Sequence, residues 1–82
     1  MNKIVFNYSQ LKDRLDDEGV TQSRLAKDIG ISEKSLEKIL SDGLPFKIRN
    51  IKNICKILHI PHTDIGQYFF IERFDHNEQL GQ

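Results

Sequence analysis

Apolar residues recur every three or four positions along most of the chain, the spacing that places side chains on one face of an α-helix. Tyr8, Leu11 and Leu15 follow this period and predict a first helix over residues 9–18. Gly19 follows directly and predicts the end of that helix, because glycine readily adopts the left-handed conformation that closes a helix.

The next two predicted helices each carry a start signal and a stop signal. Thr21 and Ser32 are residue types that cap helix N-termini, and Gly30 and Gly43 follow the last apolar positions. Apolar residues flank each cap at the spacing of a hydrophobic staple: Val20 with Leu25, and Ile31 with Leu36. Because only residues 30–32 separate the two helices, the chain must turn sharply and set the second helix across the first.

The remainder of the chain predicts two more helices. One runs from Lys47 or Ile48 to His59, because apolar residues keep the helical period until Pro61 prevents continuation. A short one is predicted around residues 62–68. Residues 3–8 and 68–74 are rich in strand-favouring types and could form a small strand pair that joins the two ends. We therefore predict an all-α, five-helix domain over residues 1–74, followed by a polar tail over residues 75–82.

Composition narrows the class of protein. A chain of 82 residues holds one small domain, and no stretch approaches the roughly 18 uninterrupted apolar residues of a membrane span. The N-terminus lacks the pattern of a secretory signal, and a single cysteine cannot form an internal disulfide. We therefore expect a cytoplasmic protein that has no membrane partner.

Charge is balanced in total, with 12 Lys and Arg against 12 Asp and Glu, but it is uneven along the chain. Residues 43–60 contain no acid and four bases, which are Lys47, Arg49, Lys52 and Lys56. A basic segment of this kind can contact phosphates, although a solvated helix face would have the same composition.

Residues 21–40, TQSRLAKDIGISEKSLEKIL, resemble the helix-turn-helix of the lambda-repressor-like family of phage repressors and Cro proteins. Gln22 opens the motif, Ala26 and Gly30 occupy its small-residue positions, and the apolar positions match without a gap. The downstream sequence IPHTDIGQYFF extends the resemblance over nearly the whole chain. The resemblance implies a transcriptional regulator of five helices that binds a double-stranded DNA operator as a homodimer in a bacterial host cell.

In the family that the chain resembles, the second helix of the motif enters the major groove with its N-terminal residues facing the bases. The base contacts implied for this chain are Glu33, Lys34, Ser35 and Lys38. Lysine can donate to guanine, glutamate can accept from cytosine, and serine can do either. The alternative is that these residues form an ordinary solvent-exposed face. However, Glu33 with Glu37 and Lys34 with Lys38 are like charges four residues apart, which destabilise a helix, so helix stability does not explain the pattern well.

The phosphate contacts that we expect are Gln22, Ser32, Lys47, Arg49 and Lys52. The resemblance assigns this role to Gln22 and to the segment that leads into the fourth helix. Lys47 and Arg49 lie where the positive end of the helix dipole disfavours cations. A DNA phosphate bound there would relieve this conflict, because it would interact with both the cations and the helix N-terminus.

The aromatic segment near the C-terminus predicts a second surface. Phe69, Phe70, Ile71 and Phe74 exceed what so small a core can absorb, so we expect them in a homodimer interface. The alternative, that all four pack on their own domain, is equally open at this point. A dimer would place two recognition helices on half-sites about 34 Å apart.

Other classes of function have less support. Cys55, His59 and His62 have a spacing that a metal could use, but a fourth ligand is absent and Cys55 lies on the apolar stripe. We therefore expect no metal and no other cofactor. No third group orients a Cys–His pair, so we expect neither an enzyme nor a small-molecule substrate. The main alternative is a protein-docking adaptor, of antirepressor or antitoxin type, built on the same fold.

Overall fold

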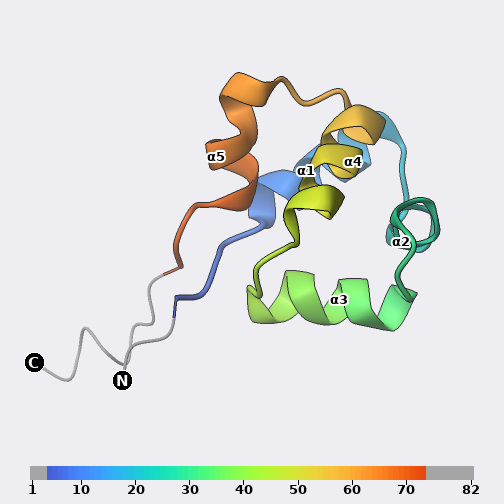
Figure 1. Ribbon diagram of the computed structural model, residues 1–82, viewed down its shortest axis with the longest axis horizontal. Coiled ribbons are helices and arrows are strands. Elements are labelled where there is room, and N and C mark those ends of the chain that lie inside the picture. The colour runs from blue at the N-terminus through green and yellow to red at the C-terminus, as the bar shows by residue number, and fades with distance from the viewer. Residues whose placement is uncertain (1–3, 74–82) are drawn as a thin grey trace, which may run out of the picture.

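The computed structural model describes residues 4–73 and shows a helical domain (Figure 1). The helices within this range are α1 (Ser9–Glu18), α2 (Gln22–Ile29), α3 (Glu33–Asp42), α4 (Ile48–Leu58) and α5 (Ile65–Phe69), with the 3₁₀ turn η1 (His62–Asp64) before α5. The predicted all-α class is confirmed, and the observed helices match the predicted ones closely. The predicted boundary between domain and tail lies outside the described residues.

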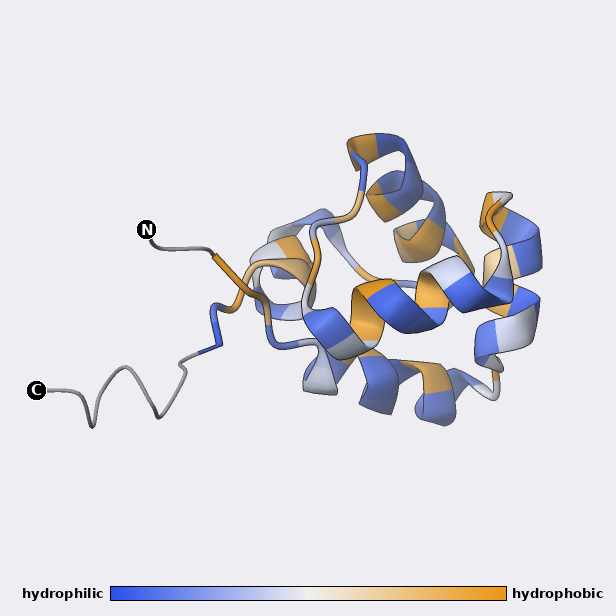
Figure 2. Ribbon diagram, turned by 90° about the horizontal axis from the view of Figure 1, so that it is seen from below, coloured by the Kyte–Doolittle hydropathy of each residue, from blue (hydrophilic) through white to orange (hydrophobic). Residues whose placement is uncertain are grey.

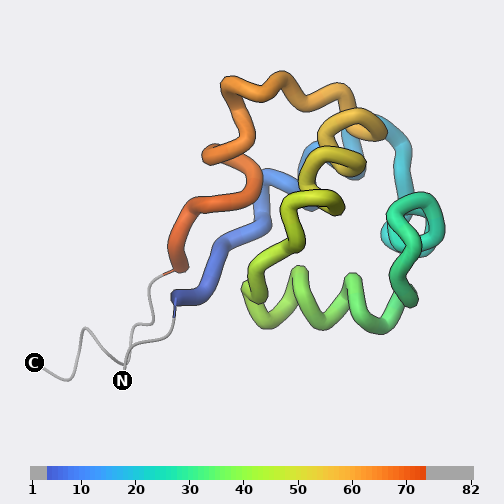
Figure 3. Tube along the Cα trace, in the orientation of Figure 1, coloured from blue at the N-terminus to red at the C-terminus, as the bar shows by residue number. Residues whose placement is uncertain are grey.

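Helix α4 supplies several buried residues to the core, among them Ile51, Ile54 and Leu58, and the other helices lie around it (Figures 1 and 3). Helix α4 packs against α1 and α2, and α5 packs against α1. Helix α3 packs against α2 and runs along one edge of the domain, so that much of its surface faces away from the other helices (Figure 1). Within the described range, no helix is both long enough and apolar enough to cross a membrane.

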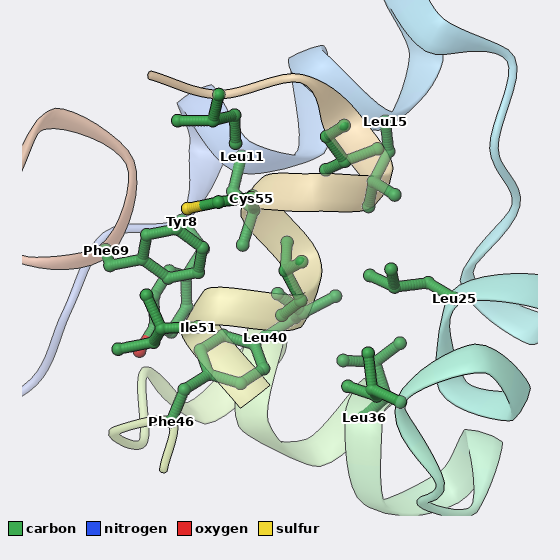
Figure 4. Packing of buried hydrophobic residues seen from close by; sticks show 14 of the residues in the cluster. Tyr8, Leu11, Leu15, Leu25, Leu36, Leu40, Phe46, Ile51, Cys55 and Phe69 are labelled. Atoms are coloured by element: carbon green, nitrogen blue, oxygen red, sulfur yellow. The ribbon is translucent and has the colours of Figure 1, made fainter. Parts of the chain in front are cut away.

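Most of the core is built from residues that the helical period places on one face, and Tyr8, Phe46 and Ile60 join it from outside the helices (Figure 4). Figure 2, in which the ribbon is coloured by hydropathy, shows apolar and polar residues alternating along the helices. The largest fully buried side chains are Phe69, Leu11, Leu25, Leu36, Ile54 and Leu58. Burying a side chain of this size stabilises a domain by about 1.5–3 kcal/mol, so these few residues carry much of the folding free energy.

Arg14 of α1 holds the C-terminal end of α4. Its Nε donates to the Leu58 carbonyl at 2.9 Å, and its Nη2 donates to the His59 carbonyl at 2.6 Å. These carbonyls have no partner within their own helix, so the guanidinium satisfies acceptors that a helix end leaves open. His59 itself adopts a left-handed conformation with φ of 57° and contacts the Glu18 carboxylate through Nδ1 at 3.1 Å.

The predicted strand pair between the two ends is reduced to one antiparallel bridge between Phe6 and Glu72. Two backbone hydrogen bonds flank it, from Asn7 N to the Ile71 carbonyl and from Arg73 N to the Val5 carbonyl, each 2.7 Å long. A two-stranded ribbon is marginally stable by itself, and these segments are too short to extend the pairing.

Candidate nucleic-acid interface

The unit formed by α2 and α3 has the local geometry that the sequence predicts. Thr21 caps α2, where its hydroxyl accepts from Arg24 N at 3.1 Å, and Ser32 caps α3, where its hydroxyl accepts from Ser35 N at 3.0 Å. Gly30 turns the chain between them with φ of 81°. Ala26 is buried and small, so α3 can cross close to α2. The short turn and the two caps together fix the direction of α3.

Helix α3 buries one face and presents the other to solvent. Leu36 and Leu40 point into the core, whereas the predicted base-contact residues are all exposed: Glu33, Lys34, Ser35 and Lys38. All four residues are therefore accessible to an external ligand along the first six residues of α3, as the sequence predicts. Their role in reading bases stays a prediction.

Two of these four side chains already have partners, one within α3 and one at its N-cap. Lys38 Nζ lies 3.4 Å from an Asp42 carboxylate oxygen, and the Ser32 hydroxyl donates to the Ser35 hydroxyl at 2.9 Å. Both side chains of the Lys38 pair are exposed, so the pair contributes little to stability and can exchange for another partner. Glu33 and Lys34 form no ion pair among residues 4–73, which leaves both available to an external ligand.

The cations predicted to contact phosphates lie along the start of α4. Lys47, Arg49 and Lys52 are exposed and form no ion pair with any described residue. Lys47 is the N-cap of α4 but makes no side-chain cap hydrogen bond, so the first turn of that helix offers uncapped amides. Gln22 is half-exposed at the start of α2, and Ser32 is exposed although its hydroxyl already caps α3.

The C-terminal end of α3 is held by contacts that sequence patterns did not reveal. Phe6 N donates to the Gly43 carbonyl at 2.9 Å, the Tyr8 hydroxyl donates to the Leu44 carbonyl, and Arg73 Nη1 donates to the Ser41 carbonyl at 3.3 Å. Burial raises the pKa of Tyr8 to about 12, so the hydroxyl remains a donor throughout the physiological range. Gly43 could be recognised from the sequence only as a helix stop, because its contact with the N-terminal segment is not local.

The predicted dimer residues separate into two environments. Phe69 is only 1% exposed and packs edge-on against Phe46 with ring centroids 5.7 Å apart, so its assignment to an interface was wrong. It fills the core because α5 turns that side of the helix toward α1. Phe70 and Ile71 are 50% and 43% exposed. Phe74 lies outside the described residues.

Cys55 lies in the core, as its place on the apolar stripe predicts, and burial raises the pKa of its thiol. It is therefore a neutral packing residue in this fold. Within residues 4–73, no three His, Cys, Asp or Glu side chains are grouped closely enough to hold a metal ion.

One known protein family matches the region that contains α2, α3 and α4. The family described as "Protein of unknown function (DUF739)" matches residues 4–72, which is nearly the whole described domain. The chain belongs to the DUF739 family. The match covers α2, α3 and the start of α4 together, so the exposed surface described above lies entirely within the DUF739 region.

This DUF739 protein is also similar to a solved structure. That structure is the solution structure of the modulator of repression of the temperate bacteriophage TP901-1 from Lactococcus lactis. The two chains are 29% identical with a TM-score of 0.64, and the match covers 79% of this chain and 88% of the other. No curated protein matches this chain.

Proposed function

We propose that this DUF739 protein regulates phage gene expression by binding double-stranded DNA through α3. The observation that carries the proposal is the outward face of α3, which presents Glu33, Lys34 and Ser35 at the N-terminal end of a rigid, capped helix. An α-helix fits the major groove, and helix-turn-helix proteins use this part of the helix to contact base edges. The similar TP901-1 protein is a modulator of repression, and this supports a role in phage regulation.

The start of α4 supplies the electrostatic part of the proposal. Lys47 is the N-cap of α4 and Arg49 is its second residue, so two exposed cations lie at a helix end whose first amides have no side-chain cap. A DNA phosphate there would gain from both, whereas in the free protein the cations oppose the helix dipole. Contacts of this kind hold a protein in register on the duplex, and they leave the choice of sequence to α3.

The first test measures how DNA binding depends on salt. Mobility shifts against DNA flanking the protein's own coding region should give a binding constant that falls steeply as salt rises. Replacing both Lys47 and Arg49 with alanine should weaken binding to every sequence and reduce the logarithmic salt slope by about 1.8, because each lost phosphate contact removes about 0.9. Replacing Lys34 should instead reduce the preference for the operator over unrelated DNA.

Lys12→Ala with Lys27→Ala is the matched control, since it removes the same charge from exposed positions on α1 and α2. The control should leave the slope nearly unchanged. If both double variants changed the salt slope equally, the cause would be the loss of net charge, and a phosphate site at α4 would be contradicted. Absence of any salt-sensitive binding would contradict the DNA proposal itself.

The exposed apolar residues at the paired ends support a homodimer as the DNA-bound form. Ile4, Phe70 and Ile71 are all exposed, and the bridge between Phe6 and Glu72 brings their two segments together. One small module contacts few base pairs, so a symmetric pair gives the discrimination that an operator requires.

Ile71→Glu should convert this dimer to a monomer in sedimentation equilibrium, because it places a charge in the apolar contact. Ile48→Glu is the control, since it makes the same change at an exposed isoleucine that lies on α4 and outside the paired terminal segments. A wild-type protein that sediments as a monomer at every concentration would contradict the dimer.

A protein-docking adaptor is the second candidate function. The exposed side of α3 carries Glu37 and Asp42 as well as Glu33, and these acids repel phosphates. They would instead suit a protein surface of mixed charge, and a modulator of repression could act on another regulator. In this case the salt series would show no DNA binding, and a protein ligand would protect α3 from hydrogen exchange.

A further inference from the structure

We propose that one flank of α4 is a docking surface for an acidic amphipathic helix of a partner protein. The surface consists of Ile48, Lys52, Cys55 and Lys56 on α4, together with Ile60 and His62 beyond its end. We call it the α4 flank. This inference goes beyond DNA binding and does not rest on it.

The α4 flank combines an exposed apolar residue with a groove. Ile48 is 71% exposed, the most exposed of the large apolar side chains among the described residues. Lys52, Cys55 and Lys56 follow it at intervals of four, seven and eight residues, which places all four on the same side of the helix. A groove of about 350 Å³ begins at Lys52, and its apolar floor is formed by the edges of Cys55 and Ile60, core residues that are 5% and 4% exposed. The stripe therefore extends for about 12 Å along the helix axis.

The charge of the α4 flank defines the partner. Lys52, Lys56 and His62 line the groove, and neither lysine forms an ion pair with another residue in the described range. Residues 43–60 contain no acid that could neutralise them. A helix that docks there must place apolar side chains on Ile48 and in the groove, and carboxylates beside the lysines. This is the pattern of an acidic amphipathic helix, whose anchors recur at the spacing of one helix face.

The position of the groove leaves α3 accessible. Figure 1 shows α4 running from the α3 edge of the domain toward the opposite side, where η1 follows it. The groove uses the C-terminal half of α4 and the turn beyond, so the bulk of a docked helix would lie away from the outer face of α3. Lys52 is also one of the cations expected to contact a DNA phosphate, so a partner helix seated on the α4 flank would compete with DNA for this residue while the outer face of α3 stays exposed.

A peptide titration tests this inference. The probe is a synthetic amphipathic helix of Leu, Ala and Glu, with Leu on one face and Glu on the other. Added to isotope-labelled protein, it should shift the amide signals of Cys55 and Ile60. Ile48→Ser and Lys56→Glu should each weaken its binding by about tenfold, because one removes an apolar anchor and the other reverses a charge at the rim. Both side chains are exposed, so both variants should fold.

Lys27→Glu is the matched control, since it makes the same charge change on α2, and it should alter the affinity less than twofold. A second control peptide has Lys in place of every Glu and should not bind. The inference is overturned if shifts occur elsewhere, if the basic peptide binds equally well, or if inorganic phosphate alone reproduces the shifts. The titration contains no DNA, so its failure and a failure of the DNA proposal are distinguishable.

Discussion

Gly43→Ala should destabilise the domain by about 2–5 kcal/mol, a large part of what holds a chain of this size together. Gly43 has φ of +70°, a conformation that costs other residues about 1–2 kcal/mol. An added Cβ would also lie 2.5 Å from the Phe6 carbonyl oxygen and 2.8 Å from Phe6 N, and it would meet the Val5 side chain. Because two of these obstacles are backbone atoms, no rotamer change relieves the clash.

Gly30→Ala separates the cost of the backbone conformation at Gly43 from the cost of the steric clash. Gly30 also has positive φ, at +81°, but no atom lies within 4 Å of the added Cβ. Its substitution should therefore cost only about 1 kcal/mol for the backbone conformation. Chemical unfolding of both variants measures the difference. Equal losses would mean that the N-terminal segment does not pack on Gly43, and that the end of α3 is not held as described.

Phe69→Ala should destabilise the domain by about 3–5 kcal/mol and leave much of the protein unfolded at 37 °C. The ring is fully buried against Phe46, and small domains have few other side chains to fill the resulting cavity. The loss should be the same at low and high protein concentration, because Phe69 packs within its own chain. Thermal and chemical unfolding over a concentration series checks both statements.

Phe70→Ala is the neighbouring control. Phe70 is half-exposed and contacts Phe6 edge-on with ring centroids 5.7 Å apart, so its loss should cost about 1 kcal/mol or less at low concentration. If the dimer forms, the effect of this variant should grow with protein concentration. If Phe69→Ala is as mild as Phe70→Ala, the assignment of Phe69 to the core is contradicted.

The parts of the candidate nucleic-acid interface that depend on residues close together in the sequence were predictable. The exposed face of α3 follows from the period of Leu36 and Leu40 and from the cap at Ser32, and the basic start of α4 follows directly from the order of residues. The groove of the α4 flank was not predictable. It depends on how Ile60 and His62, on either side of Pro61, lie beside α4, and no periodic pattern specifies that path.

The order of residues thus determined the helices, their caps and their apolar faces, because hydrogen bonding and side-chain spacing within a helix act over three or four residues. Only the tertiary structure decided between Phe69 and Phe70, since adjacent aromatic residues carry the same local signal and differ only in what lies opposite them. Only the tertiary structure showed that Phe6 and Tyr8 hold the end of α3. Contacts between segments more than 30 residues apart depend on the packing of the whole domain, and short-range patterns do not encode them.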